Sequence, residues 1–335
     1  MIRRRFFGFA ALAAAGFGNI ACSGSIGSEL PENARSLNDA LTRFRSLPGT
    51  PVYAIDIESA RQEPLTRINH LSDRQLLIGS AFKTFIVLKC LQDMEEGKLS
   101  DAQLIDINDA IRVNNSDVFI NLSGTVQLRS VLDAICAYSD NTASDAAMAQ
   151  VGADRVRAFI ASAGLASTRI PDSIRILESY LSGAPLNTDI GWAGVQQLLK
   201  GVLAGTPRPA INNQVSIIST ADDLVSYYRR AMRGEFFSKP TSVHAFKHFH
   251  GQGNLLSEAL PETAIYAKLG NVSWLEFNAF CYPGQMILPD GTRVTFAFAV
   301  NWSGTDSDDV YTKFISTLGA TLTAIKELYK PGNTA

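Results

Sequence analysis

A serine and a lysine lie three positions apart in the apolar stretch IGSAFKTFIVLKC, residues 78–90. On a helix, positions i and i+3 share a face with Cβ atoms about 5–6 Å apart, so Ser80 and Lys83 are expected to be neighbours. A serine acts as a nucleophile only with a base in hydrogen-bonding reach. Lysine can be that base when burial or a second cation lowers its pKa from about 10.4. The apolar surroundings therefore indicate that Lys83 activates Ser80.

A second group of polar residues, Ser139-Asp140-Asn141, begins 59 residues after Ser80 and follows an expected helix. A tripeptide of this kind often forms only a turn or a helix cap. Its position gives it another interpretation, in which the Ser139 hydroxyl relays a proton to a leaving nitrogen. The amide of Asn141 would then hold Lys83 and a substrate amide.

A third group, Lys268-Leu269-Gly270, falls on an expected strand. Glycine on a strand permits a ligand to approach the backbone closely. Lys268 would supply the second cation that lowers the pKa of Lys83, and it would attract an anionic group of a substrate.

Hydrophobic periodicity places helices and strands around these motifs. We expect helices at 37–44, 80–96, 128–137, 153–163 and 221–233, and a terminal helix whose apolar face is Val310, Phe314, Leu318, Leu322 and Ile325. Segments rich in β-branched and aromatic residues predict strands at 51–59, 67–70, 262–274, 275–284 and 292–302. Residues 174–216 mix helix-like pieces with a stretch rich in Pro, Gly and Asn and are expected to form a long loop. This order predicts an α/β layer built from the two termini and holding an all-helical insertion.

The composition is that of an ordinary globular protein. A hydrophobic fraction of 46% and a charged fraction of 19% over 335 residues allow a large core. A net charge of −2 gives no indication of nucleic acid or an anionic membrane surface as a partner.

The N-terminal residues 1–22, MIRRRFFGFAALAAAGFGNIAC, have the pattern of an export signal. Three arginines precede a short apolar stretch that is too short to cross a bilayer, and the Arg-Arg-Phe-Phe order resembles a twin-arginine signal. Cys22 is a candidate lipid-attachment site, although Asn19 departs from the lipoprotein pattern, and simple cleavage is the alternative. Residues 23–34, rich in Ser, Gly and Pro, would form a tether.

Cysteines and histidines give no strong second site. The three remaining cysteines are an odd number, so at least one stays unpaired, and buried small hydrophobes are the favoured interpretation for Cys90, Cys136 and Cys281. Histidines in HAFKHFH have a spacing known from metal sites, but no acidic or cysteine partner is nearby. A surface or half-buried helix is therefore expected for His244, His248 and His250.

The three polar motifs, in this order, resemble the Ser-x-x-Lys, Ser-Asp-Asn and Lys-Thr-Gly motifs of class A β-lactamases and penicillin-binding serine enzymes. Residues 125–148 and 219–238 are also similar to the helical region of that family. The resemblance covers about residues 35–330. It implies one catalytic domain, 35–332, with a β-lactamase/DD-peptidase-like α/β fold. An antiparallel sheet with flanking helices would come from 35–79 and 240–332, and an all-helical part from 80–239.

The resemblance implies a catalytic role for three side chains. Ser80 would attack a carbonyl and become acylated, Lys83 would take its proton, and Ser139 would pass a proton to the departing nitrogen. Substrate binding is implied for Asn141, Lys268, Gly270 and Asn271. The backbone N–H groups of Ser80 and Asn271 would form an oxyanion hole, worth about 3–4 kcal/mol per donor.

Two departures from the family pattern affect the expected activity. Leu269 replaces a hydroxyl residue, so penicillin-like carboxylates should be recognised more weakly. The Glu-x-x-Leu-Asn loop, whose glutamate activates water, finds its best match in GAPLN, with Gly183 at the glutamate position; alignment from Ser167 gives Ile174 instead. Neither is acidic. Asp172 and Glu178 are nearby candidates for a deacylation base, or are ordinary solvated loop acids.

These observations predict an exported serine hydrolase that opens β-lactam amides through an acyl-serine, with slow deacylation. The alternatives are a D-Ala-D-Ala peptidase, a transpeptidase or another amide or ester hydrolase, and a binding or sensing protein that is acylated without turnover. No metal or cofactor is expected. The partner would be a β-lactam or a peptidoglycan-like peptide, with no nucleic acid and with membrane contact only through a lipid anchor. A monomer in the periplasm or cell envelope is expected.

Overall fold

The computed structural model describes residues 32–61, 64–252, 255–256 and 259–330. The expected export signal, Cys22 and most of the expected tether lie outside the described residues. Residues 32–34, which the sequence analysis places in the tether, are the first turn of α1 (Glu32–Arg45). No helix in the described part of the chain is both long enough and apolar enough to cross a membrane.

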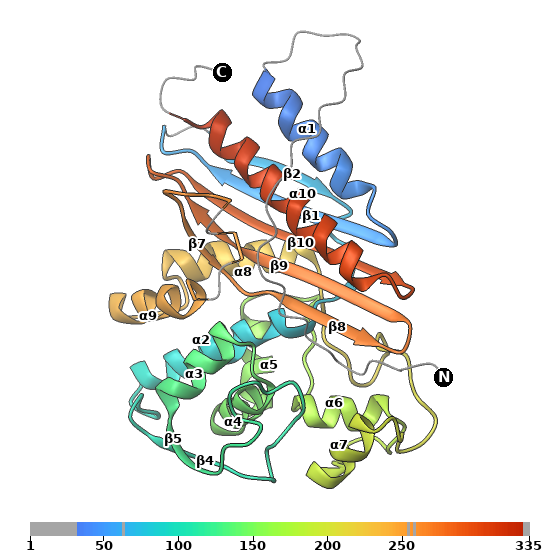
Figure 1. Cartoon of the computed structure of the whole chain (residues 1–335). Coiled ribbons are helices and arrows are strands. Elements are labelled where there is room, and N and C mark those ends of the chain that lie inside the picture. The colour runs from blue at the N-terminus through green and yellow to red at the C-terminus, as the bar shows by residue number, and fades with distance from the viewer. Residues whose placement is uncertain (1–31, 62–63, 253–254, 257–258, 331–335) are drawn as a thin grey trace.

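One antiparallel sheet joins the two ends of the catalytic region (Figure 1). Its strands, in spatial order, are β2 (Thr66–His70), β1 (Thr50–Glu58), β10 (Arg293–Ser303) and β9 (Phe277–Ile287), and then β7 (Ala264–Ala267) and β8 (Gly270–Trp274) along one edge. The predicted antiparallel sheet built from both termini is confirmed by the pairing of β1 with β10, from Thr50 opposite Asn301 to Glu58 opposite Arg293.

The sheet edge next to the site is interrupted. Both β7 and β8 pair with β9, but Lys268 and Leu269 fall between them and belong to neither strand. The sequence placed both residues on a continuous strand, and this is wrong. Lys268 lies outside both strands, although its backbone N–H still donates to the carbonyl of Pro283 in β9 at 3.2 Å.

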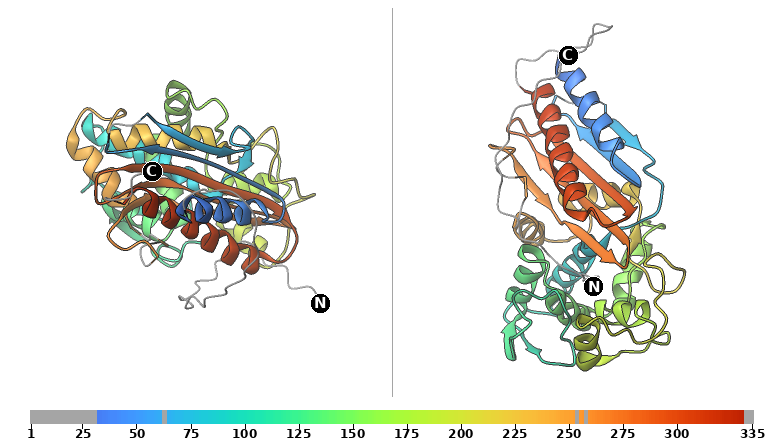
Figure 2. Two further views of the ribbon diagram at one scale, coloured as in Figure 1. Left: turned by 90° about the horizontal axis from the view of Figure 1, so that it is seen from above. Right: turned by 45° about the vertical axis from the view of Figure 1, so that its right-hand side comes forward.

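Helices cover both faces of the sheet. The helices α1 and α10 (Ser307–Leu328) lie side by side on one face (Figure 2). The predicted apolar face of the terminal helix is confirmed, because all five of its expected residues are buried in the cluster between α10 and the sheet. The helix α8 (Ala221–Arg233), predicted with these bounds from the sequence, packs against β10, β9 and β1. It thus connects the helical part to the sheet.

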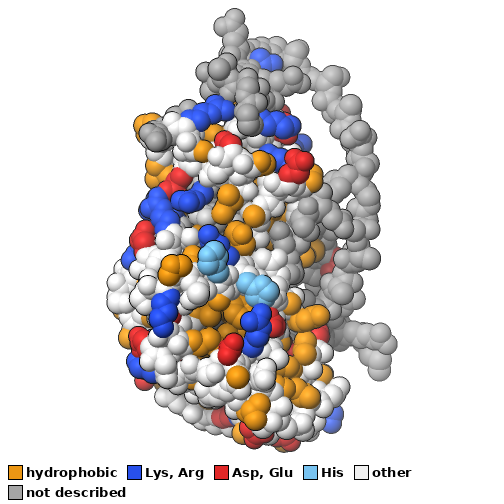
Figure 3. All heavy atoms as spheres, turned by 90° about the vertical axis from the view of Figure 1, so that its left-hand side faces the viewer, with side chains coloured by type: hydrophobic (Ala, Val, Ile, Leu, Met, Phe, Trp, Pro, Cys, Tyr) orange, Lys and Arg blue, Asp and Glu red, His pale blue; other side chains and the backbone are white. Residues whose placement is uncertain are grey.

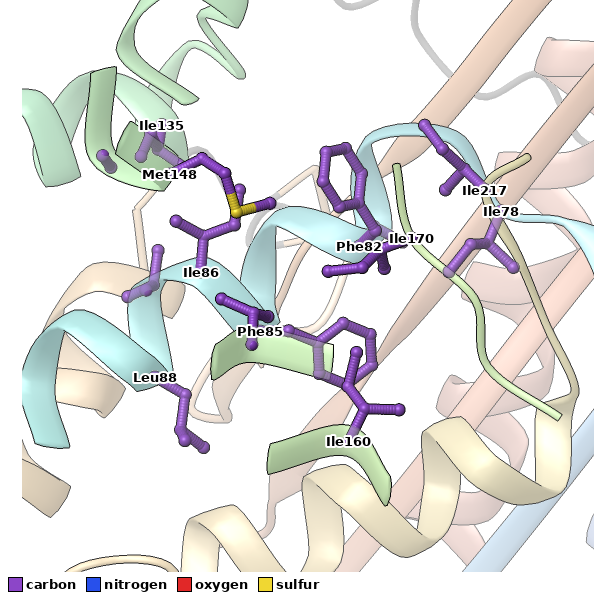
Figure 4. Close-up of a cluster of buried hydrophobic side chains, with 14 of the residues drawn as sticks. Ile78, Phe82, Phe85, Ile86, Leu88, Ile135, Met148, Ile160, Ile170 and Ile217 are labelled. Atoms are coloured by element: carbon purple, nitrogen blue, oxygen red, sulfur yellow. The ribbon is translucent and has the colours of Figure 1, made fainter. Parts of the chain in front are cut away.

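The helical part is organised around α2 (Lys83–Glu95), which follows the 3-10 turn η1 (Gly79–Phe82). Phe82, Phe85 and Ile86 are buried: Ile86 lies near Met148, Phe85 near Ile160 and Phe82 near Ile170 (Figure 4). The other helices are α3 (Leu128–Ala137), α4 (Asn141–Val151), α5 (Ala153–Ser162), α6 (Ile174–Leu181), α7 (Gly191–Leu199) and α9 (Pro240–His250). Short strand pairs are β3 (Leu76–Leu77) with β6 (Ile218–Ser219), and β4 (Leu104–Ile107) with β5 (Gly124–Gln127).

The expectation of a long loop over 174–216 is wrong, because this segment contains α6 and α7. The side chain of Ser173 caps α6 by accepting a hydrogen bond from the Ile176 N–H at 3.0 Å. Helix α7 carries Gly191 and Gly194, which lower helix propensity and hide it from a periodicity argument. The correction matters because α6 carries Glu178.

The three cysteines in the described part of the chain, and one of the histidines, are buried in the protein interior. Cys90, Cys136 and Cys281 are free and buried, as expected for small hydrophobes. His250, expected on a surface or half-buried helix, is instead fully buried. Among the described residues, no group of three or more His, Cys, Asp or Glu side chains could hold a metal ion. Positive and negative side chains are interspersed on the face in Figure 3.

Candidate active site

Ser80 lines a pocket between the helical part and the edge strand β8. Two glycines allow the strand to press on the turn that carries this serine. A Cβ on Gly270 would lie 2.0 Å from the Ile78 carbonyl oxygen, and one on Gly79 would lie 2.7 Å from the Asn271 carbonyl oxygen. Real Cβ atoms do not approach so closely, so the backbone of Asn271 lies against the backbone just before Ser80.

Lys83 is completely buried one turn after Ser80. Its Nζ donates to the carbonyl oxygen of Ser139, to Ser139 Oγ at 3.3 Å and to Asn141 Oδ1 at 2.7 Å. Among the described residues, no hydrogen bond joins Nζ to Ser80. Burial, and then the charge of Lys268, hold the pKa of Lys83 well below its ordinary value of 10.5. The lysine therefore has the lowered basicity that a neutral general base requires.

Ser139 and Asn141 face the site, whereas Asp140 between them holds the local structure. Asp140 Oδ1 caps α4 by accepting from the Ala143 N–H at 2.8 Å, and Oδ2 accepts from Val118 and Phe119 N–H groups at 3.0 Å. Ser139 has a left-handed backbone, with φ of 57°. The turn and cap interpretation thus applies to Asp140, while its two neighbours contact Lys83.

Lys268 is the last member of a chain of polar side chains that runs from Lys83 through Ser139. Its Nζ donates to Ser139 Oγ at 2.8 Å and to the Leu269 carbonyl oxygen at 2.9 Å, and the residue is 4% exposed. Burial lowers the pKa of Lys268 from 10.5 to about 8. The Ser139 hydroxyl therefore lies between two buried lysines. Leu269 packs against the hydrophobic cluster on the opposite face of the sheet, the face covered by α1 and α10.

Glu178 on α6 lines the same pocket as Ser80, Asn141 and Asn271. It is 1% exposed, so the expectation that it is an ordinary solvated loop acid is wrong. Burial, and then the nearby Asp145, hold the pKa of Glu178 well above its ordinary value of 4.5. Its carboxylate accepts hydrogen bonds from the amide of Asn114, at 2.5 Å to Oε1 and 3.2 Å to Oε2, with the amide assigned so that its nitrogen faces the carboxylate.

The other proposed positions for an acid do not supply one. A Cβ on Gly183 would lie 2.4 Å from the Gly205 carbonyl carbon, so this glycine packs on another loop. Asp172 forms an ion pair with Arg157 at 2.7 Å and does not line the pocket of Ser80. Ile174 lines that pocket but is apolar. Of these candidates, Glu178 is the acid that the fold brings to the serine.

The register of the family loop aligned from Ser167 fits the pocket better than the match to GAPLN. Residues 174–178 read IRILE, with Ile174 at the glutamate position, Leu177 at the leucine position and Glu178 at the asparagine position. All three of these residues line the pocket of Ser80. The acid therefore lies four positions after the one at which the family pattern expects it.

Asp145 was not singled out from the sequence, yet it fixes the helix that carries Glu178. Its carboxylate accepts from the backbone N–H groups of Ile174 at 2.7 Å and Arg175 at 3.0 Å, at the start of α6. The pKa of Asp145 is raised to about 6, because its burial outweighs these hydrogen bonds. Arg175 also forms a salt bridge with Asp189, which ties the residues that follow α6 to the first turn of that helix.

The site thus combines a serine hydroxyl, a buried lysine of lowered pKa, a hydroxyl held between two lysines, and a carboxyl group across the pocket. These are the parts of nucleophilic acyl transfer with separate groups for proton removal and proton delivery. The remaining polar lining is uncharged, from Asn115, Asn141, Asn271 and Ser273. Among the described residues that line this pocket, none is a lysine or an arginine.

Comparison with known proteins gives the family of this chain. The model of the Beta-lactamase2 family, described as the β-lactamase enzyme family, matches residues 34–325. Beta-lactamase 1 of Streptomyces cacaoi is 28% identical over 202 residues, which is 55% of this chain and 60% of that protein. This chain thus spans about three fifths of the relative that it matches.

Solved structures show the same fold at low sequence identity. A β-lactamase from Sphaerobacter thermophilus has a TM-score of 0.66 and 18% identity, covering 88% of this chain and 97% of its own. PBP-A has a TM-score of 0.64 and 14% identity, covering 91% of this chain and 99% of its own. Since the family model matches most of the chain, the protein belongs to the β-lactamase enzyme family.

Proposed function

We propose that this protein is a serine hydrolase that opens the amide of β-lactams through an acyl-Ser80 intermediate and releases that intermediate slowly. The observation that carries the proposal is the contact of Ser139 Oγ with both Lys83 and Lys268, since Lys83 also holds the side chain of Asn141, which lines the pocket of Ser80. A buried hydroxyl between two amines has no evident structural purpose, but it is suited to proton relay.

Acylation follows from these contacts. Ser80 Oγ attacks the substrate carbonyl while its proton passes to Lys83 Nζ, which burial keeps available as a base. The N–H groups of Ser80 and Asn271 stabilise the oxyanion that forms. As the C–N bond breaks, the leaving nitrogen takes the proton of Ser139, and Ser139 recovers a proton from Lys83. The lysine is neutral again at the end of the step.

Deacylation is assigned to Glu178. Its carboxylate takes a proton from water, the water oxygen attacks the ester carbonyl, and the bond to Ser80 Oγ breaks as that oxygen recovers a proton. The carboxyl group must be ionised to act, and burial raises its pKa, which disfavours the ionised form. Slow release is attributed to this shift rather than to a missing acid.

Substrate preference is proposed from the third motif. Leu269 directs an apolar side chain to the far face of the sheet, so no hydroxyl at this position can bind a substrate carboxylate. Lys268 is the cation left for that group, and it already has two acceptors. This favours, as a second candidate function, hydrolysis of other small amides or esters that carry no carboxylate at that position.

Export to the periplasm or cell envelope remains a proposal from the sequence. It rests on residues 1–22, with their three arginines, short apolar stretch and Cys22. The mass of the mature protein purified from cell envelopes tests it, because cleavage at Cys22 with added lipid, cleavage alone and the intact chain differ. An intact chain confined to the cytoplasm would contradict the proposal.

Nitrocefin hydrolysis, combined with mass spectrometry of the protein, tests the proposed function. We expect Ser80→Ala to abolish both turnover and the covalent adduct, and Lys83→Ala to lower acylation by about 10²–10⁴-fold. Lys89→Ala is the matched control, because Lys89 lies on the same helix but pairs with Asp93 at 2.8 Å. It should leave the rate of acylation unchanged.

Three results would be read differently. Steady turnover that depends on Ser80 supports the hydrolase. A single stoichiometric burst with no further product indicates the binding or sensing protein. If Ser80→Ala and Lys83→Ala both match the wild type, the site is assigned wrongly.

A further inference from the structure

The hydrogen-bond partner of Glu178 comes from outside its own helix. Asn114 lies in the loop between β4 and β5 and is 3% exposed. Its amide contacts both carboxylate oxygens of Glu178, at 2.5 and 3.2 Å. We propose that Asn114 is a positioning residue, which orients the Glu178 carboxylate toward the pocket and stabilises its charged form. This inference rests on the proposed function for the role of Glu178 in deacylation.

The loop around Asn114 is built to hold it in place. The side-chain hydroxyl of Thr142, the residue after the Ser139-Asp140-Asn141 motif, contacts Val113 N–H at 3.0 Å, the Val113 carbonyl at 3.2 Å and Ser116 Oγ at 2.6 Å. The Asn141 N–H donates to the Asn115 carbonyl at 3.2 Å. The backbone on both sides of Asn114 is therefore held to the start of α4, which also supplies the Asn141 contact to Lys83.

The helix that carries Glu178 offers no equivalent amide. Helix α6 contains neither asparagine nor glutamine, and the hydroxyl of Ser182, the residue that follows it, donates to the Ser179 carbonyl. Asn114 thus brings an amide to the carboxylate from a different segment. The sequence gives no hint of this, because Asn114 and Glu178 are 64 residues apart.

Three groups from three elements act on the charge of Glu178. Asp145 on α4 raises the pKa of this carboxyl group, whereas Lys83 on α2 and the hydrogen bond from Asn114 lower it. Burial, the largest effect, raises it. A hydrogen bond to a charged group is strong enough to correspond to a shift of about one to two pH units. Without Asn114, less of Glu178 would be ionised at neutral pH, and its orientation would be lost.

The experiment measures the titration of Glu178 directly and then its kinetic effect. The carboxyl C=O stretch of protonated Glu178 is followed by infrared spectroscopy from pH 4 to 9, and the band is assigned by its loss in Glu178→Gln. We expect the titration midpoint to rise by about one to two pH units in Asn114→Ala. Asn114→Asp, which is nearly the same size, should shift it in the same direction, because it replaces a donor with a second acid.

Asn108→Ala is the matched control, since it removes another asparagine of the same loop, one whose side chain bonds only to Asp106 and Ala110. It should leave the midpoint where it is. Stopped-flow kinetics with nitrocefin should then show acylation changed less than about threefold in Asn114→Ala and deacylation at pH 7 slowed by about 10–100-fold. The acidic limb of the deacylation profile should move up with the infrared midpoint.

The two ways of failing are distinguishable. A wild-type protein that forms no acyl-enzyme contradicts the proposed function, while the infrared midpoints still report whether Asn114 acts on Glu178. A midpoint that stays unchanged in a folded Asn114→Ala or Asn114→Asp protein overturns the inference, whatever the activity. Should Asn114→Ala fail to fold, Asn114→Asp alone decides, because it leaves no cavity.

Discussion

At the scale of single residues, the site gathers ionisable groups that are costly to bury. Lys83 and Lys268 are taken out of water with no carboxylate in direct hydrogen-bond contact, and burial is the first cause of the lowered pKa of each. Glu178 is shifted in the opposite direction by the same cause. Burial thus brings an amine toward its neutral form and a carboxyl group toward its protonated form. Opposite pKa shifts of neighbouring groups are typical of paired acid and base roles.

The separate contribution of Glu178 can be isolated by one substitution. We expect Glu178→Gln to leave acylation of Ser80 nearly unchanged and to slow deacylation by about 10²–10⁴-fold, because glutamine cannot take a proton from water. Mass spectrometry after mixing with penicillin should show an acyl-enzyme that persists. Asp172→Asn is the control, since Asp172 pairs with Arg157 outside the pocket. Unchanged turnover of Glu178→Gln would remove this residue from the mechanism.

At the scale of elements, the contact between β8 and η1 decides whether the motifs meet. Gly270 is the residue of closest approach, and no Cβ can be accommodated there without moving the backbone of Ile78 or Ala81. The third motif therefore needs its glycine for packing between two elements, in addition to any access that it gives a ligand. Lys268 lies in the gap between β7 and β8, and from there its side chain reaches Ser139.

A single methyl group tests this contact. Gly270→Ala should push β8 away from η1, lower the free energy of unfolding by about 1–3 kcal/mol and reduce acylation by more than its effect on stability explains. Gly319→Ala in α10 is the control, because its Cβ would meet Leu256 at an ordinary 3.6 Å. That helix-interior change should be neutral or stabilising by up to about 1 kcal/mol. Urea unfolding and nitrocefin kinetics on both variants decide; a fully active Gly270→Ala protein would contradict the packing argument.

Sequence patterns predicted elements well where a single local signal dominated. The bounds of α3 and α8 were predicted as observed, because each has an apolar stripe of helical period and clear ends. Helix α6 was missed because it has only 8 residues and depends on contacts from Ser173 and Asp145. The motif residues Ser80, Lys83, Ser139 and Lys268 could be named from their order. Asn114 could not, since its role depends on the meeting of two segments.

At the scale of the whole molecule, a buried polar network connects helix α2, which carries Lys83, to helices α8 and α9. Thr84 Oγ1 contacts His250 Nε2 at 2.8 Å and the Tyr227 hydroxyl at 3.0 Å, which joins α2, α9 and α8 next to Lys83. His250 Nδ1 lies 2.8 Å from the Phe246 carbonyl, so Nδ1 carries the hydrogen and Nε2 accepts. Burial lowers the pKa of His250 from 6.5 to about 4. The folded protein holds this imidazole neutral.

This network predicts how stability depends on pH. Between pH 6.5 and about 4 the unfolded chain binds a proton at His250 that the folded chain does not, so acidification favours unfolding. The contribution of His250 to the free energy of unfolding should fall by about 3 kcal/mol across this window. Urea unfolding at pH 7.5 and pH 4.5 should show a smaller loss in His250→Gln than in the wild type. His244→Gln, an exposed position of the same helix, should behave as the wild type; equal losses in all three proteins would contradict the prediction.

The pairing of β1 with β10 has a consequence for biosynthesis. Thr50 is opposite Asn301, and β9 and β8 join the sheet only through β10 and one another. A ribosome that has made the first two motifs therefore holds a nascent chain in which Ser139 still lacks Lys268. At that point β1 must wait for about 160 further residues to emerge before Thr50 can pair with Asn301. The enzyme should thus become reactive only after translation is almost finished, and prematurely terminated chains should be inert toward penicillin.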